Sequence, residues 1–89
     1  MAWGIEFERA AARELDKLGP QSAERILRFL RDRVAPLDDA RSIGQALKGG
    51  RFGEFWRYRV GDFRVIARIE DAERLILVLR IGHRREVYQ

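Results

Sequence analysis

The residues best suited to chemistry lie in the second half of the chain, where arginines recur at alternate positions. Arg57 and Arg59 alternate with apolar residues, as the two-residue period of a β-strand requires. Gly61-Asp62 follows and predicts a hairpin turn. With a two-residue loop, Arg59 lies directly opposite Arg64. Like charges opposed across strands are destabilising, so the pair indicates an anionic ligand, although long arginine side chains also spread readily into water.

A second group of reactive side chains comes at the end of the chain: His83, Arg84 and Tyr88. The chain has no cysteine, and its two serines, Ser22 and Ser42, lie in the first half, so a nucleophilic triad is excluded. The carboxylates are dispersed, and the single histidine makes a zinc site improbable. No cofactor and no metal are expected.

These residue types suit a metal-free reaction on RNA. The 2′-hydroxyl of the substrate can attack the adjacent phosphate, so the protein supplies proton transfer and charge stabilisation. Arginines can stabilise the charge on the phosphorane, a base titrating near neutrality can take the proton, and an aromatic ring can support an unstacked nucleotide.

The first half of the chain predicts the elements that support this group. Residues 3–7 alternate as a short strand, and from Glu8 the apolar spacing becomes helical up to Gly19. Pro20 suits the start of a second helix, about Gln21 to Val34, which Pro36 ends. The apolar stripe of this helix is predicted as Ala23, Ile26, Leu27, Leu30 and Val34. Its arginines, Arg25, Arg28, Arg31 and Arg33, are interpreted as a solvated face with ion pairs.

The second half predicts three consecutive strands. The two-residue turn pairs Val60 with Phe63, Tyr58 with Val65 and Trp56 with Ala67. A turn near Glu70 to Arg74 leads to the last strand, Leu75 to Ile81. An odd number of turn residues puts Leu75, Leu77, Leu79 and Ile81 in the core and Arg80 near Arg64, whereas an even number reverses these faces.

The stretch from Leu37 to Gly53 gives the weakest signals. Asp39 is predicted to cap a short helical turn through Ile43. The glycines around Lys48 match neither a P-loop nor a dinucleotide fingerprint, so they are expected to shape a loop.

Length and charge limit the number of domains and the kind of partner. At 89 residues, the chain is expected to be one domain, residues 1–89. The formal net charge of +4 belongs entirely to residues 48–89, which favours a polyanion or an acidic protein as partner of that half. No membrane-spanning run and no signal peptide are visible, so a cytoplasmic location and no membrane partner are expected.

Two motifs together resemble the RelE branch of the RelE/ParE toxin superfamily. They are the run Trp56-Arg57-Tyr58-Arg59-Val60-Gly61-Asp62-Phe63-Arg64-Val65-Ile66 and the end Ile81-Gly82-His83-Arg84-Arg85-Glu86-Val87-Tyr88, with Leu47-Lys48-Gly49 as a weaker third. The resemblance implies a RelE-like toxin domain of the α+β class. Its fold would be a small curved, mainly antiparallel sheet of about four strands with an N-terminal helical hairpin packed on it, in the order β-α-α-β-β-β.

The resemblance also implies a toxin of a type II toxin–antitoxin pair that cuts messenger RNA on the ribosome without metal, with an antitoxin as partner. Some relatives carry a lysine in the second strand for proton transfer, which arginine does not replace readily because it stays charged. We therefore assign His83 as general base, Arg64 and Arg84 as stabilising groups and Tyr88 as a stacking or proton-positioning group. The substrate-binding residues are expected to be Arg57, Arg59, Lys48 and Arg80.

Two alternatives remain open from the sequence. A ParE-like toxin would share the scaffold but act on DNA gyrase. An inactive basic module would bind RNA or protein without cutting.

Overall fold

The computed structural model describes residues 2–47 and 55–85. The elements, in chain order, are β1 (Gly4–Phe7), α1 (Arg9–Lys17), α2 (Pro20–Phe29), the π-helical turn η1 (Leu30–Val34), β2 (Gln45–Ala46), β3 (Trp56–Val60), β4 (Phe63–Glu70) and β5 (Leu75–His83). The predicted α+β class and the order of its helices and strands are confirmed. The sheet also contains β2, a two-residue strand that the sequence did not predict.

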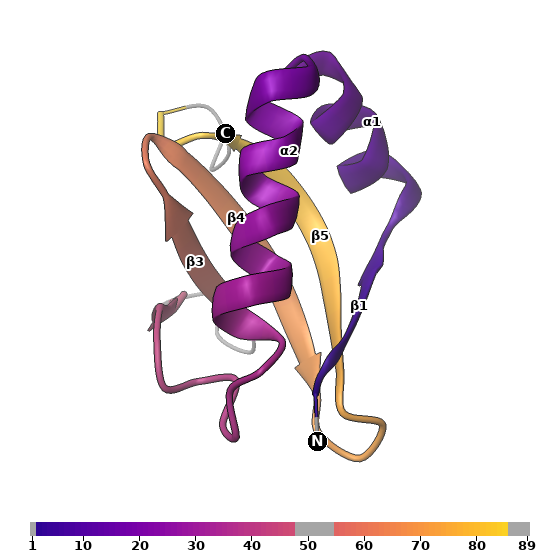
Figure 1. Ribbon diagram of the computed structural model, residues 1–89, viewed down its shortest axis with the longest axis vertical. Coiled ribbons are helices and arrows are strands. Elements are labelled where there is room, and N and C mark those ends of the chain that lie inside the picture. Colours follow the sequence, from indigo (N-terminus) through magenta and orange to yellow (C-terminus); the bar gives the residue numbers. More distant parts are fainter. Residues whose placement is uncertain (1, 48–54, 86–89) are drawn as a thin grey trace.

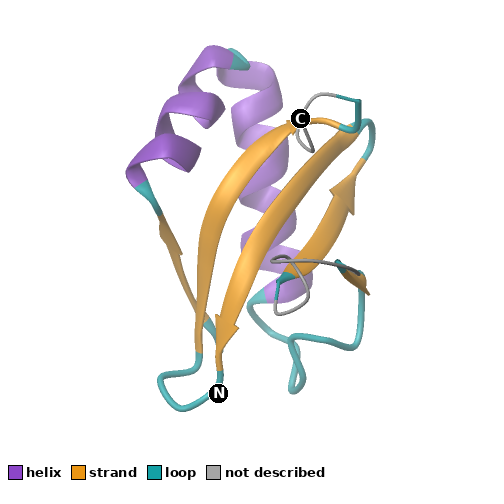
Figure 2. Ribbon diagram, turned by 180° about the vertical axis from the view of Figure 1, so that it is seen from behind, coloured by secondary structure: helices purple, strands orange, loops and turns teal. Residues whose placement is uncertain are grey.

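The five strands form one sheet in the order β1-β5-β4-β3-β2. The pair β1 and β5 is parallel, and the other neighbours are antiparallel. Figure 1 shows α1 and α2 on one side of the sheet, which we call the helix face. Figure 2, from behind, shows the strands in front of both helices, so no helix in the described residues covers this side. We call it the open face.

The core lies between the helices and the sheet. Its fully buried side chains include Ala11 of α1, Ile26 of α2, Leu30 and Val34 of η1, and Tyr58, Val65, Ile76 and Val78 of the sheet. Because the strands alternate, the positions between these residues point to the open face.

The hairpin of β3 and β4 has the predicted register. Val60 pairs with Phe63, Tyr58 with Val65, Trp56 with Ala67 and Arg59 with Arg64. Gly61 adopts a φ of +61° in the turn, a left-handed conformation that costs glycine less than other residues. The two-residue loop predicted from Gly61-Asp62 is therefore confirmed.

The turn between β4 and β5 has an even number of residues, because Glu70 pairs directly with Leu75 across four turn residues. The core face of β5 accordingly starts with Ile76 and Val78, both fully buried. The register then shifts by one between Ala67, which pairs with Val78, and its neighbour Ile66, which pairs with Arg80. A β-bulge of this kind inserts one unpaired residue and bends the strand.

The bulge residue is Leu79, and it moves the core face of β5 from even to odd positions. Ile81, past the bulge, is 1% exposed. The end of β5 that carries the C-terminal motif is thus oriented by an irregularity that simple alternation does not predict.

The second helix extends to Val34, as predicted, but its last turn widens into η1, where the Ala35 N–H donates to the Leu30 carbonyl at 2.8 Å. The prediction that Leu27 belongs to the core stripe is wrong, since its side chain is 40% exposed. Ile26 faces the sheet, and Leu27 lies about 100° further round the helix. Leu27 instead lines a shallow groove beside β1. None of the helices in the described residues is long and apolar enough to cross a membrane.

The predicted helical turn from Asp39 to Ile43 is wrong. The Oδ1 of Asp39 accepts the Arg41 N–H at 2.9 Å, and its carbonyl accepts the Ser42 N–H at 3.0 Å. The Asp39 side chain therefore stabilises a local turn, because an Asx hydrogen bond competes with continued helix formation.

Two aromatic side chains of β3 hold this segment against the sheet. The Tyr58 hydroxyl donates to the Ala40 carbonyl at 2.6 Å, and Trp56 Nε1 donates to the Ile43 carbonyl at 2.7 Å. Burial raises the pKa of the Tyr58 phenol above its ordinary value. These bonds bring the chain to β2, which pairs with the start of β3.

An exposed ion pair joins the same segment to the β4–β5 turn. Arg41 Nη1 and Nη2 donate to Asp71 Oδ1 and Oδ2 at 2.9 and 3.0 Å. This bidentate hydrogen bonding by Arg41 holds the pKa of the Asp71 carboxyl below its usual value. Because the pKa is lower in the folded state, the pair stabilises the fold above the ordinary carboxyl pKa, and this contribution is lost as the pH falls through the folded value.

Asp71→Asn is expected to lower the thermal midpoint at about pH 7, where the wild-type carboxylate is charged, and its effect is expected to shrink as the pH falls through the lowered pKa of the folded state. Thermal melts across this range measure the difference between the two proteins. Glu73→Gln, in the same turn, is the matched control. A difference that persists unchanged at low pH would contradict the role assigned to the charge.

Candidate functional site

Three of the predicted site residues lie on the open face. Arg57 and Arg59 come from β3 and Arg64 from β4, with Arg59 and Arg64 paired across the strands. Arg59 is exposed, and Arg57 is half-buried, with its Nη2 donating to Gln45 Oε1 of β2. The alternation of β3 that buries Tyr58 in the core therefore sets two guanidinium groups on the opposite side.

Arg64 differs from Arg59 in its burial. Its side chain is 6% exposed, and its Nη1 donates to the carbonyls of Gly61 and Phe63 at 3.0 and 2.9 Å. These bonds hold a guanidinium at the base of the hairpin turn, where a buried charge requires several hydrogen-bond partners. Burial also places this cation in a medium where its attraction for an anion is stronger than in water.

The C-terminal motif is attached to the same turn. His83 pairs with Phe63 at the ends of β5 and β4, and their ring centroids are 4.8 Å apart. The Arg84 N–H donates to the Asp62 carbonyl at 3.0 Å. A hollow of about 310 Å³ lies at this end of the sheet. It is lined by Asp62, the exposed His83, Arg84 and Arg85.

His83 and the paired arginines point to different sides of the strand ends. Residues directly opposite one another share a face, so His83 shares the helix face with Phe63, whereas Arg59 and Arg64 lie on the open face. The two groups are close in register, because Arg64 pairs with Gly82, the neighbour of His83. The site residues thus surround one end of the sheet from both sides.

Arg80 lines a hollow together with His83 and with Glu14 of α1. Its Nη2 lies 3.2 Å from Oε2 of Glu14 on α1. The other oxygen of Glu14, Oε1, accepts the Ile81 N–H at 2.9 Å, just past the β-bulge. Past the bulge, Arg80 pairs in register with Ile66, two residues from Arg64 on the same strand, and its charge is balanced by the Glu14 carboxylate.

The sequence did not identify Glu14 as part of this region. Nothing in the neighbouring sequence marks Glu14 as a site residue, because it is an ordinary polar position next to Leu15 in the apolar stripe of α1. The contact joins residues 66 positions apart, a separation over which no periodicity carries information.

Two predicted site residues, Lys48 and Tyr88, lie outside the described residues. Within the described ranges 2–47 and 55–85, no group of three or more histidine, aspartate or glutamate side chains is arranged to hold a metal ion.

The sequence matches the family model described as the ParE toxin of type II toxin–antitoxin systems (parDE) over residues 5–88. This chain belongs to the RelE/ParE toxin family. The protein is accordingly a type II toxin, and the resemblance predicted from its motifs is confirmed.

The protein is also similar to individual toxins in sequence and in fold. The protein is 29% identical to Toxin RelG of Mycobacterium tuberculosis over 91 residues, which cover 100% of this chain and 99% of that protein. Its fold is similar to a chain of the M. tuberculosis toxin–antitoxin complex RelBE2, with a TM-score of 0.83, 24% identity, and coverage of 94% of this chain and 100% of the other. A chain of the RelE–RelB complex of Pyrococcus horikoshii gives a TM-score of 0.72, 24% identity, and coverage of 98% and 100%.

Proposed function

We propose that this toxin is a metal-independent endoribonuclease that cuts messenger RNA on the ribosome. The observation that carries the proposal is the cross-strand pair of Arg59 and Arg64 on the open face. Like charges at directly opposed strand positions are destabilising, and a bound phosphate would offset this cost. Family membership supports the proposal, since the RelE branch acts on messenger RNA.

In the proposed reaction the 2′-oxygen of the substrate attacks the adjacent phosphorus. A bond forms between the 2′-oxygen and phosphorus, and the bond from phosphorus to the 5′-oxygen breaks. The leaving 5′-oxygen takes a proton from water, so the products are a cyclic phosphate and a 5′-hydroxyl. His83 takes the 2′-proton as general base. Arg64 and Arg84 stabilise the additional negative charge on the phosphorane. Tyr88 stacks on the nucleotide or positions the proton.

Substrate binding is assigned to the remaining basic residues. Arg57 and Arg59 would bind phosphates along β3, and Lys48 is assigned the same role from the sequence. Arg80 would contribute at its edge, where Glu14 balances the charge and reduces the expected effect of removing it. Arginine suits these positions because its planar guanidinium donates two parallel hydrogen bonds to a phosphate.

A cognate antitoxin is the proposed protein partner. Two of the similar folds come from complexes of a toxin with its antitoxin, RelBE2 and RelE–RelB. An acidic or amphipathic segment that covers Arg57, Arg59 and Arg64 would neutralise the open face and block access of RNA.

A second candidate function is action on DNA gyrase. It is favoured by the match to the ParE model over residues 5–88. In that case the basic open face would contact a protein, and no RNA would be cut.

One experiment distinguishes these functions. The purified toxin is incubated with programmed ribosomes and messenger RNA, the cut sites are mapped by primer extension, and gyrase supercoiling is assayed in parallel. Cuts at defined codon positions support the endoribonuclease. Intact message with inhibited supercoiling supports the gyrase function. If the toxin neither cuts the message nor inhibits supercoiling, the inactive binding module is supported. Rescue of toxic expression by the product of the neighbouring reading frame tests the antitoxin.

A further inference from the structure

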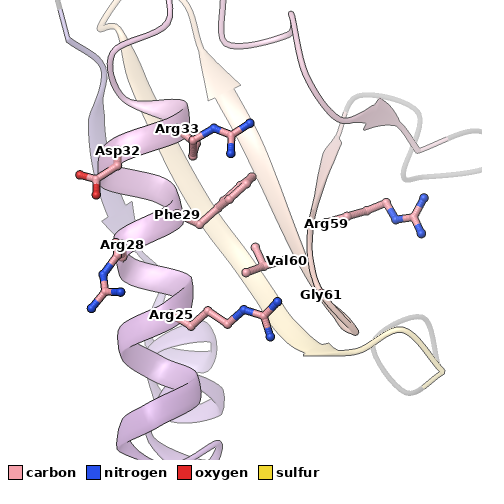
Figure 3. Close-up of a pocket in the computed structure, with 8 residues that line it drawn as sticks. All are labelled: Arg25, Arg28, Phe29, Asp32, Arg33, Arg59, Val60 and Gly61. Carbon is pink, nitrogen blue, oxygen red and sulfur yellow. The ribbon is translucent and has the colours of Figure 1, made fainter.

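Two hollows lie where the helices meet the hairpin end of the sheet. Figure 3 shows the first, between α2 and β3. Of the residues assigned to the reaction, this hollow includes only Arg59, whose guanidinium points away from α2. The second hollow, of about 250 Å³, lies between α1 and β5, and Glu14, Arg80 and His83 are among the residues that line it. The proposed general base therefore borders α1.

Glu14 takes the place of a neighbouring strand at one edge of β5. The parallel strand β1 ends at Phe7, opposite Val78, and the chain then turns into α1. Past Val78, β5 has no strand on this edge within the described residues. The N–H of the buried Ile81 donates across the edge to Oε1 of Glu14 at 2.9 Å. The carboxylate thus satisfies a backbone donor for which the sheet provides no carbonyl.

This hydrogen bond lies directly after the β-bulge at Leu79. A bulge bends its strand and re-aims the side chains beyond it. On the other side of His83, the Arg84 N–H donates to the Asp62 carbonyl at 3.0 Å. His83 therefore lies between two fixed backbone amides. The amide of Ile81 is held by α1, and that of Arg84 by the hairpin turn.

The ion pair of Glu14 with Arg80 is the weaker of its two contacts. The carboxylate oxygens lie 3.2 to 3.3 Å from Nε and Nη2 of Arg80, longer than the about 2.7 to 2.9 Å of strong charge-assisted hydrogen bonds. The side chains of Arg80 and Glu14 are 40% and 27% exposed, so water screens the pair. The role of Glu14 at this end of β5 therefore depends on its oxygen as an acceptor more than on its charge.

We propose that Glu14 is a positioning residue: by holding the Ile81 N–H it fixes the bend of β5, so that His83 and Arg84 reach the end of the sheet where Arg64 lies. This inference rests on the function proposed above. A displacement of about 1 Å, even from a change far from the reacting atoms, can cost about 10²-fold in rate. Because the pairing of β5 with β4 continues to His83, the strand itself is expected to form without Glu14.

Two substitutions separate the acceptor from the charge. Glutamine keeps an oxygen for the Ile81 N–H, whereas alanine does not, and both are strong helix formers that preserve α1. In single-turnover cleavage of message on the ribosome, Glu14→Ala is expected to lower the maximal rate about 10- to 100-fold. Glu14→Gln is expected to stay within about threefold of wild type, since only a screened ion pair is lost.

The control and the dependence on toxin concentration distinguish positioning from a general effect of charge. Asp16→Ala removes the same charge from an exposed position of α1 and is expected to cleave at the wild-type rate. The toxin concentration that gives half of the maximal rate is expected not to rise in Glu14→Ala, because a misplaced general base lowers kcat and leaves substrate binding intact.

The contact itself is measured without RNA. Amide hydrogen exchange of the isotope-labelled full chain, followed by NMR, is expected to become at least about tenfold faster at Ile81 in Glu14→Ala and to stay slow in Glu14→Gln. The ring signals of His83 are expected to shift in Glu14→Ala only. If Glu14→Ala does not fold, Glu14→Met, which has a similar length and no oxygen, is measured in its place.

Three results would each overturn the proposal: equal exchange at Ile81 in all variants, cleavage by Glu14→Ala at the wild-type rate, or an equal loss of rate in Glu14→Ala and Glu14→Gln. An equal loss in Asp16→Ala would also overturn it, in favour of a general effect of charge. Failure of the function proposed above has a different result, because wild type itself then cuts no message. Failure of the present inference leaves the wild-type rate intact.

Discussion

Substitution of His83 by alanine is expected to lower the rate of messenger RNA cleavage on the ribosome by about 10²- to 10⁴-fold, the usual contribution of a positioned general base. Arg84→Ala is expected to cost about 10²- to 10³-fold, because one charge-stabilising donor is lost. Both effects should fall mainly on kcat, since they concern interactions that strengthen in the transition state. Single-turnover primer extension measures them.

The fold should survive both changes, because His83 and Arg84 are exposed and surface substitutions usually have small effects. Arg13→Ala, an exposed arginine on α1, is the charge-matched control for Arg84→Ala and is expected to cleave at the wild-type rate. Cleavage at the wild-type rate by His83→Ala would remove His83 from the reaction. Equal losses in His83→Ala and Arg13→Ala would point to unfolding or to a general effect.

A second large effect is expected from the core of β5. Ile76→Ala should lower the free energy of unfolding by about 2 to 5 kcal/mol, the range for deletion of a buried aliphatic side chain that leaves a cavity. Ile76 is fully buried between the sheet and the helices. Domains of this kind have a total stability of about 5 to 15 kcal/mol, so this one change removes a large part of it. Urea denaturation followed by circular dichroism measures the change.

The adjacent substitution Leu77→Ala is the matched control. Leu77 is half-buried on the open face, opposite Glu6 and Arg68. Its loss is expected to cost about 1 kcal/mol, close to the average for point substitutions. A larger loss for Leu77→Ala than for Ile76→Ala would mean that β5 has the opposite face in the core.

The sequence by itself determined the features that depend on neighbours in the chain. The period of two in β3 and β4, with Gly61-Asp62 between them, was sufficient to predict the register in which Arg59 meets Arg64. The change from a period of two to a helical period predicted the helical hairpin, and the motifs of the second half predicted the family. Local periodicity and turn chemistry carry this information because each acts over a few residues.

The tertiary structure alone decided features that depend on distant residues. The bulge at Leu79 and the bonds of Glu14 to Arg80 and Ile81 orient the end of β5, and they pair the charge of Arg80 with a carboxylate of α1. The packing of Arg25 on Gly61 likewise joins a helix to a turn far along the chain. Such contacts form only when the helices pack on the sheet. This packing decides between side-chain positions that the local sequence leaves equally possible.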